Sequence, residues 1–434
     1  MATNRITINM DAIILDDAFI DLPGKKAGTT KLKLFYRQFS ITTTKKLIIF
    51  SMTEVLNEKS LRKPRILIAP LDWGLGHATR CIPIIRELLA NECDVWLAGE
   101  GIQTKLFSKE FPQLTILDLS GYNIKYSKTK AGLFLRLIGQ IPKMLDIVSF
   151  ENRWLKIKNE ALEFDAVISD NRYGFHNKKL FNVFITHQLG IKTGLGGFFD
   201  SLVRKINYAY IRKFDACWIP DEKNENNLAG QLSHPKRFPK PPVQYLGLLS
   251  RFHNTGIPQQ KNHILVVLSG PEPQRSILEN IIVQKISQHN GTATVVRGLL
   301  TASNFIPSTN NIKFHNHLPA EELNAEMEKA EFVISRSGYS TVMDVASLNK
   351  KSILIPTPGQ TEQEYIGKYL SASGKVLCIE QKNFTLLEAI EKAKSFSYTS
   401  FPEYNEEAFK KTIKDFVGKI VTRINPALYA EFLG

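Results

Sequence analysis

The sequence predicts an α/β protein with two parallel sheets. From Arg65 onward, short apolar runs alternate with helix-length stretches, a pattern typical of βαβ units. The pattern restarts at His263, after a stretch (Pro235–Pro258) rich in proline, glycine and basic residues that is typical of a linker. At 434 residues, the chain exceeds the size at which a single hydrophobic core stops growing. We therefore expect two Rossmann-like domains joined by a linker.

The expected elements of the first half start with the strand Arg65–Pro70. A loop at Leu71–His77 and a helix near Ala78–Leu89 follow it, and a second helix follows Gly101. The other expected strands are Val95–Ala98, Leu114–Asp118, Ala166–Ser169, Val183–Thr186 and Ala216–Ile219. Residues 1–60 show mixed polarity and weak periodicity, which predicts a poorly ordered or appended leader.

The second half starts with the strand His263–Leu268 and a helix at Ile277–Ser287. Helices are also expected from Ser340 or Thr341 and from near Glu362. The remaining expected strands are Thr294–Arg297, Ile312–Phe314, Phe332–Ile334, Ser352–Ile355 and Lys375–Cys378. An amphipathic helix at Glu406–Ile424 is expected to cross back onto the first domain. The predicted boundaries are 62–240 for the first domain, 241–260 for the linker, 261–400 for the second domain and 401–434 for the closing helical segment.

Composition narrows the functional classes. Hydrophobic content of 43% and charged content of 23% are typical of a globular protein, and no transmembrane run or signal-peptide core is present, so we expect a cytoplasmic location. The four cysteines are scattered without metal-ligand spacing, so no metal site is expected. A net charge of +14 suits an anionic membrane face, anionic small substrates or simple solubility. No nucleic-acid-binding motif is present, so nucleic acid is not expected as a partner.

One stretch bears on the membrane hypothesis. Tyr122–Phe150 interleaves basic and apolar residues, so it is either a basic amphipathic helix lying on an anionic bilayer or a core helix with a solvated basic face.

The turn that follows Phe332–Ile334 is the strongest candidate for an anion site. Its small residues allow backbone N–H groups to approach a diphosphate, and the next helix points its positive end at the same place. Asp344 is placed to bind a ribose, and Glu362 and Gln363 are placed to bind sugar hydroxyls. The turn residues are Ser337, Gly338, Ser340 and Thr341. An ordinary capped strand–turn–helix explains the same pattern.

A second phosphate-binding turn is expected after His263–Leu268, where Ser269 and Gly270 precede Arg275. Its two prolines remove N–H donors, so a rigid turn without ligand is the alternative.

The first domain supplies a candidate acceptor side. Gly74 and Gly76 precede His77, the side chain best suited to act as a general base near neutral pH, and Arg80 adds positive charge. Asp170 and His187 follow two other strands. Asp170 is a candidate to orient His77 or to bind the acceptor hydroxyl, and a simple helix cap or loop carboxylate is equally compatible.

Together these motifs resemble the GT-B glycosyltransferases, and most closely the MurG-like enzymes. Arg336–Asp344 (RSGYSTVMD) resembles the family's uridine-diphosphate motif over about residues 325–370, and Gly74–His77 resembles its acceptor loop. The resemblance implies two domains facing across a cleft, with Arg336 and Thr341 among the donor-binding residues. It also implies an inverting transfer from a UDP-sugar to a hydroxyl, with no metal or cofactor and with His77 and Asp170 as catalytic residues.

The resemblance further suggests a lipid-linked or cell-envelope acceptor and a peripheral location on the inner face of the membrane. Asp344 replaces the family's glutamate, Gly367 stands where its asparagine is usual, and Ser269–Arg275 replaces its glycine-rich loop. Donor identity therefore stays open. A UDP-sugar 2-epimerase of the same fold and a non-catalytic nucleotide-sugar or lipid-binding protein are the alternatives.

Overall fold

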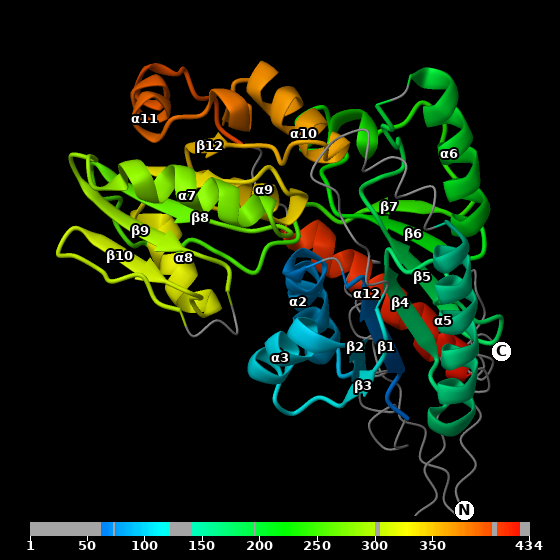
Figure 1. Cartoon of the computed structure of the whole chain (residues 1–434). Helices are drawn as coiled ribbons and strands as arrows, with labels where there is room; N and C mark the ends of the chain where they lie inside the picture. The colour runs from blue at the N-terminus through cyan, green and yellow to red at the C-terminus, as the bar shows by residue number, and fades with distance from the viewer. Residues whose placement is uncertain are drawn as a thin grey trace, which may run out of the picture. The chain divides into compact units, whose positions relative to one another are not determined.

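The first half of the chain forms a seven-stranded parallel sheet (Figure 1). The computed structural model describes residues 62–72, 74–121, 141–194, 196–299, 304–401 and 406–425. The predicted leader, and the part of Tyr122–Phe150 that precedes residue 141, lie outside these ranges. The sheet order is β3-β2-β1-β4-β5-β6-β7. The strands β2 and β3 are added on one side of β1, and the order of addition then reverses, because β4 to β7 are added on its other side. The elements in order are β1 (Arg65–Pro70), α2 (Leu75–Ala90), β2 (Asp94–Gly99), α3 (Gly101–Glu110), β3 (Ile116–Asp118), α5 (Ile141–Leu162), β4 (Ala166–Asp170), β5 (Phe181–Ile185), α6 (Gly197–Ile211), β6 (Ala216–Ile219), the 3₁₀ turn η1 (Gly230–Leu232) and β7 (Val243–Tyr245).

The second half forms a six-stranded parallel sheet in the order β10-β9-β8-β11-β12-β13. Its elements are β8 (His263–Val267), α7 (Gln274–Ile286), β9 (Thr292–Val296), β10 (Ile312–His315), α8 (Ala320–Lys329), β11 (Phe332–Ser335), α9 (Tyr339–Ser347), β12 (Ser352–Leu354), α10 (Thr361–Ala372), β13 (Leu377–Cys378), the 3₁₀ turn η2 (Gln381–Asn383), α11 (Leu386–Ser395) and α12 (Glu406–Ile424). Two parallel Rossmann-like sheets confirm the predicted α/β class.

The predicted linker needs one correction. Inside it, β7 pairs with β6 through Cys217↔Val243, Trp218↔Gln244 and Ile219↔Tyr245, and so completes the first sheet. The sequence hides this strand because it is short, only half-buried and preceded by two prolines. The domain boundaries themselves stay a prediction.

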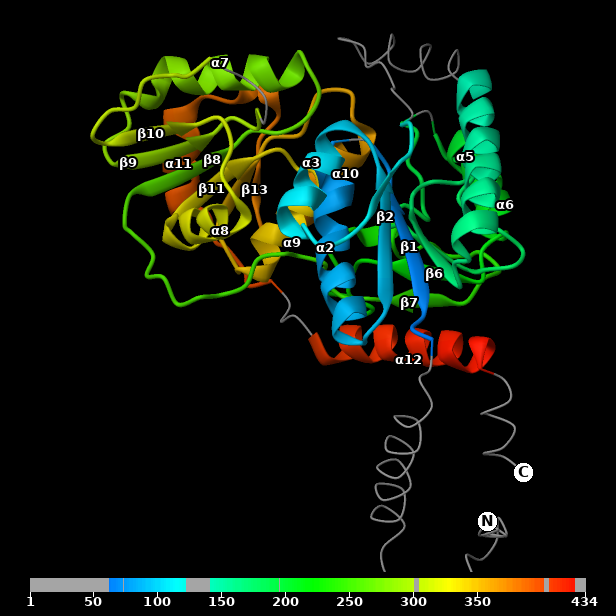
Figure 2. The ribbon, with the colours of Figure 1, turned by 90° about the horizontal axis from the view of Figure 1, so that it is seen from below.

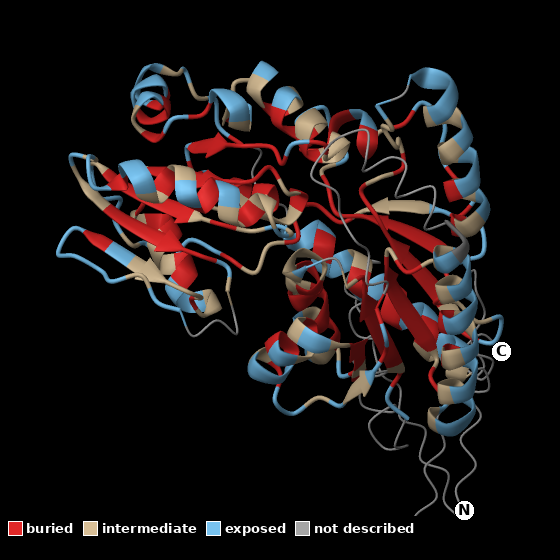
Figure 3. Ribbon diagram, in the orientation of Figure 1, coloured by how far each residue is buried: buried red, intermediate tan, exposed pale blue. Residues whose placement is uncertain are grey.

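One apolar core runs through both sheets. On β1, Ile66 and Ile68 face α2 and α3, while Leu67 and Ala69 face α5 on the other side of the sheet. The cluster that contains Ile66 also contains Val333 of the second sheet. Figure 3 shows the inner strands of both sheets buried between their helices, whereas the edge strands β3, β7, β10 and β13 are partly exposed. Since parallel sheets bury both faces, their strands are continuously apolar, which explains why the sequence revealed them.

The last described helix packs on the first sheet, as predicted. Phe416 of α12 lies edge-on to Phe181 of β5 (ring centroids 5.7 Å apart) and to Trp218 of β6 (5.2 Å apart). Figure 2 shows α12 lying across α2 and beneath the strands of the first half. The chain therefore returns to its first sheet after building the second.

Candidate active site

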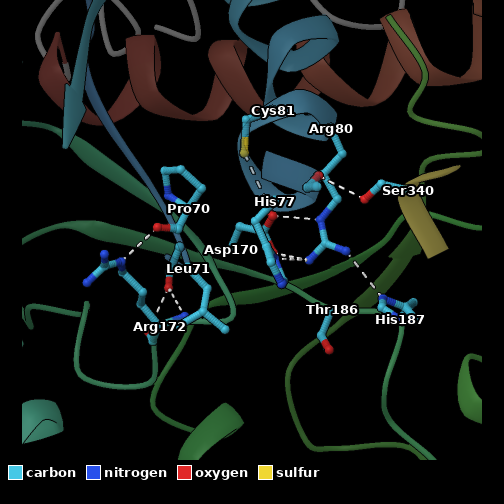
Figure 4. Close-up of polar contacts among 12 residues, drawn as sticks. Pro70, Leu71, His77, Arg80, Cys81, Asp170, Arg172, Thr186, His187 and Ser340 are labelled. Atoms are coloured by element: carbon cyan, nitrogen blue, oxygen red, sulfur yellow. Dashed lines mark hydrogen bonds and ion pairs between the residues drawn. The ribbon is translucent and has the colours of Figure 1, made fainter. Parts of the chain in front are cut away.

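The reversal point of the first sheet brings His77 and Asp170 together. Pro70, the last residue of β1, pairs with Asp170, the last residue of β4. Gly74, with φ of 77°, precedes α2, and His77 stands in the first turn of that helix. As a result, His77 Nδ1 lies 3.1 Å from Asp170 Oδ1 (Figure 4). Open α/β sheets bind ligands at this position.

Arg80 is the main partner of Asp170. Its Nε donates to Asp170 Oδ2 over 2.6 Å, and its Nη2 donates to Oδ1. Burial would raise the pKa of the fully buried Asp170, but Arg80 and His77 outweigh that effect and lower the pKa to about 2. Asp170 is therefore a carboxylate at every physiological pH. Arg80, predicted on the acceptor side, is itself buried and engaged in this pair.

His77 is held as a neutral base. Burial is the largest effect and lowers the pKa of His77 below its usual 6.5, although Asp170 acts in the opposite direction. A carboxylate only accepts, so hydrogen on Nδ1 serves the contact with Asp170 and leaves Nε2 as the base. Arg80 Nη2 also lies 2.8 Å from Nδ1, and only the other tautomer can accept from it. The two contacts of Nδ1 are thus alternatives, and only the one with Asp170 activates Nε2.

A polar chain continues from Arg80 into the second half of the molecule. Arg80 Nη1 lies 3.3 Å from His187 Nδ1, and His187 Nε2 lies 2.7 Å from Glu362 Oε1 in the first turn of α10. Gln188 donates to the other oxygen of Glu362. The ring of His187 stacks on Tyr339, with centroids 4.0 Å apart. The structure thus joins two residues that the sequence assigned to different substrates, His187 and Glu362.

The predicted donor turn is assembled at the start of α9. Ser337 Oγ donates to the carbonyl of Gln363 (2.8 Å), and Gln363 Oε1 accepts from the amide of Thr357 (2.9 Å). Gly338 caps α9, with Thr341 in its first turn, and Ser340 Oγ donates to the carbonyl of Gly76 over 2.8 Å. The donor turn therefore contacts the loop that carries His77.

Asp344 lies beside two residues that the sequence did not reveal. Ser250 Oγ donates to its carboxylate over 2.7 Å. Burial raises the pKa of Asp344 to about 6, and the nearby Arg251 and the bond from Ser250 limit the rise. Arg251 Nε is buried and has no hydrogen-bond partner among the described residues. A serine and an arginine within the connecting segment were the only signal for this pair.

Two arginines predicted to bind the donor, Arg336 and Arg275, have partners within the protein. Arg336 donates to the carbonyls of Gln274 (2.6 Å), Ile355 (3.2 Å) and Pro356 (3.4 Å), and burial lowers its pKa to about 10.

Arg275 pairs with Glu272 (2.6 Å) and Glu279 (3.0 Å), so its guanidinium braces the turn after β8. Ser269 is half-buried and Gly270, with φ of 101°, is exposed in that turn.

Gly367 explains one departure from the family pattern. A Cβ at this position would lie 2.7 Å from Cys378 Sγ and 3.1 Å from Pro356 Cγ, so the family's asparagine does not fit without movement.

The described ranges contain neither a metal-ligand cluster nor a membrane-spanning helix. In these ranges, no three His, Cys, Asp or Glu side chains are grouped to hold a metal ion. No helix in the part of the chain that the structure describes has the length and apolar character to cross a membrane.

Comparisons with known proteins agree with the fold. The family model described as "Glycosyltransferase family 28 C-terminal domain" matches residues 302–419. Over 377 residues, the chain is 21% identical to an uncharacterized glycosyltransferase of Methanosarcina acetivorans, covering 81% of this chain and 90% of that protein. Over 67 residues, it is 37% identical to the UDP-N-acetylglucosamine–N-acetylmuramyl-(pentapeptide) pyrophosphoryl-undecaprenol N-acetylglucosamine transferase of Methylobacterium radiotolerans. That match spans 15% of this chain and 18% of the relative's length.

Among solved structures, the glycosyltransferase SnogD from Streptomyces nogalater superposes with a TM-score of 0.54 at 12% identity, covering 83% of this chain and all of SnogD. The spinosyn rhamnosyltransferase SpnG gives a TM-score of 0.52 at 15% identity, covering 85% of this chain and 99% of SpnG. The fold and the matches together define a glycosyltransferase of the GT-B class. Within that class, residues 302–419 are similar to the C-terminal domain of glycosyltransferase family 28.

Proposed function

We propose that the protein transfers a sugar from a UDP-sugar to an acceptor hydroxyl with inversion at the anomeric carbon. The observation that carries this proposal is the contact between the base and the donor turn. His77 is held by Asp170 at the end of the first sheet, and Ser340 of the donor turn donates to the carbonyl of Gly76, next to His77.

In the proposed reaction, His77 Nε2 removes the proton of the acceptor hydroxyl. The acceptor oxygen attacks the anomeric carbon on the face opposite the diphosphate, and the bond to the diphosphate breaks with its electron pair moving to the departing oxygen. Asp170 stabilises the imidazolium that forms.

The donor half would bind the leaving group. The N-terminus of α9 and the amides around Gly338 would offset the diphosphate charge, and Asp344 would bind the ribose. Arg251, whose buried Nε has no partner among the described residues, would supply a further positive charge. We propose that these groups replace the divalent cation that other transferases use, and that Glu362 and Gln363 contact the sugar. No cofactor enters this scheme.

We also propose a lipid-linked acceptor and a cytoplasmic enzyme that binds the membrane from its inner face. The relative from Methylobacterium radiotolerans is named for an undecaprenol-linked acceptor, and the net charge of +14 suits an anionic surface.

The test is a calorimetric screen of nucleotide sugars, followed by incubation with lipid-linked and soluble acceptors and mass analysis of the products. We expect a UDP-sugar to bind and a product one sugar heavier than the acceptor to appear. Epimerisation of the donor without any acceptor would identify the 2-epimerase instead. Binding without turnover on any acceptor would identify a binding protein.

A further inference from the structure

Exposed apolar side chains gather on one part of the first half. Among the residues that the structure describes, ten large apolar side chains are exposed. Three lie on α5 and four lie on α6, and an eighth, Phe238, lies in a segment held against α6 by the bond from Tyr208 Oη to the carbonyl of Arg237 (2.6 Å). Such a concentration departs from the scattered single residues that are normal on a protein surface.

The exposed apolar residues of α6 follow a helical stripe. Phe198, Leu202 and Ile206 are spaced four residues apart and therefore share one face, with Phe199 beside them. The opposite face holds the helix to its sheet, since Ile211 packs in the cluster of Phe184 and Asn207 accepts a bond from Tyr173. The stripe is thus left facing solvent.

Basic residues surround this stripe. Arg204, Lys205, Arg212 and Lys213 lie on α6 or directly after it. Lys236, Arg237 and Lys240 lie in the segment that carries Phe238. Between Gly197 and Lys213 and between Lys236 and Lys240 there is one acidic residue, Asp200, and its Oδ1 already accepts from the amide and the hydroxyl of Thr193.

We propose that this α6 surface, formed by α6 with Arg212 and Lys213 and by Lys236–Lys240, docks on an anionic lipid bilayer. An apolar stripe with basic flanks is the pattern of a helix that lies in the membrane interface, where apolar burial and attraction to anionic headgroups add together. The charge excess favours a bilayer over a second copy of the chain, because two such surfaces would repel each other.

Docking there would bring the bilayer close to the candidate site. The loop before α6 accepts a bond at the carbonyl of Lys192 from Thr361 (2.8 Å), next to Glu362. The docking gives the proposed membrane binding a surface, and its consequence for the site rests on the proposed function.

The first experiment is flotation with vesicles of phosphatidylcholine, with and without phosphatidylglycerol. We expect the wild type to float with the anionic vesicles, less so as salt rises, and the F198S/L202S/I206S variant to bind at least tenfold more weakly. The control is F305S, because Phe305 is as exposed as Phe198 (76% and 77%) and lies in the other half. The changed side chains are exposed, and thermal melts would confirm that the variants fold.

The second experiment separates charge from apolar burial. We expect R212Q/K213Q/K236Q to lose at least tenfold of its binding to anionic vesicles, while K411Q/K414Q/K419Q, which removes three exposed lysines from α12, keeps it. Equal binding to neutral vesicles, or binding by F198S/L202S/I206S at the wild-type level, would overturn the proposal. A dimer in sedimentation that these serine changes dissociate would assign the surface to a second copy instead. Calorimetric donor binding reports on the proposed function separately, because it needs no membrane.

Discussion

At the scale of single residues, the capacity of His77 to accept a proton depends on which partner its Nδ1 takes. Asp170 and Arg80 both lie within hydrogen-bond distance of that nitrogen, and they favour opposite tautomers. Asp170 supplies the orientation that leaves Nε2 as a base. Arg80 keeps Asp170 ionised but competes for Nδ1. The proposed mechanism therefore requires the balance between the two partners to favour Asp170.

We expect His77→Ala to lower kcat about 10²- to 10⁴-fold while donor affinity stays unchanged, because the loss removes general-base catalysis alone. The pKa of His77 lies below 6.5, so the wild-type rate should be full at pH 7 and fall as the pH drops through that pKa. Steady-state kinetics across pH and donor calorimetry would measure both. His253→Ala, which changes an exposed histidine, is the control. Full turnover by His77→Ala would remove it from the mechanism.

The raised pKa of Asp344 predicts how the stability of the protein changes with pH. Its pKa is raised to about 6 from an ordinary value near 3.8, so the folded state binds more protons between about pH 4 and 6 and stability falls as pH rises through that window. We expect Asp344→Asn to raise the free energy of unfolding by about 1–2 kcal/mol at pH 7.5 and not at pH 4.

The same change should weaken nucleotide binding, since an amide accepts more weakly than a carboxylate. Denaturant titrations at the two pH values and calorimetry would test this, with the exposed Asp415→Asn as control. Unchanged nucleotide affinity would contradict the ribose assignment.

Contacts between residues that directly follow strands are easier to predict from the sequence than contacts of residues in connecting segments. His77 and Asp170 could be placed together because the ends of parallel strands meet at one sheet edge. The contact of Ser250 with Asp344 joins residues 94 positions apart and depends on the path of the connecting segment, which no local pattern encodes. Likewise, the sequence did not show that Arg80 pairs with Asp170 and Arg275 with Glu279, because both pairings depend on which side chains the fold buries together.

At the scale of secondary-structure elements, α2 and α9 meet through very small side chains. A Cβ on Gly76 would lie 2.8 Å from Ser340 Oγ and 3.3 Å from Ser340 Cβ. This close approach lets the Ser340 hydroxyl reach the Gly76 carbonyl and fixes the donor turn beside His77. The two helices pack on different sheets. The sequence therefore singles out Gly76 and Ser340 but does not show that they are in contact.

We expect Gly76→Ala to cost about 1–3 kcal/mol of stability and to lower kcat/KM, because the added methyl separates α2 from α9. Ser340→Gly in the same chain should restore most of the stability by making room. Gly418→Ala on α12 is the control: its Cβ would meet nothing within 4 Å, and alanine favours a helix, so it should stabilise slightly. Thermal and denaturant unfolding would measure these changes. A Gly76→Ala protein as stable and active as the wild type would show that the contact is dispensable.

At the scale of the whole molecule, the two sheets share a core instead of folding as separate units. The cluster that holds Ile66 extends to Val333, and Phe416 of α12 contacts Phe181 and Trp218 of the first sheet. The amphipathic pattern predicted that the closing helix returns to the first domain. It did not predict where the helix docks, because that depends on the shape left by β5 and β6.

We therefore expect Phe416→Ala to destabilise the protein by about 3–5 kcal/mol and both halves to unfold in one transition. All four tryptophans lie in the first half. Tryptophan fluorescence and far-ultraviolet circular dichroism, followed through the same denaturant titration, would therefore report on the first half and on the whole chain. Phe305→Ala, which changes an exposed side chain, should alter stability by less than about 0.5 kcal/mol. Two separate transitions in the wild type would contradict the shared core.

The position of α12 has a consequence for synthesis on the ribosome. Trp218 precedes its partner Phe416 by 198 residues. This face of the first sheet therefore stays exposed until α12 has been synthesised. At roughly 5–20 residues per second, the wait lasts about 10–40 s. During that time the nascent chain presents an uncovered aromatic surface to chaperones and to neighbouring chains, and the first half completes its own burial only after the second half has been translated.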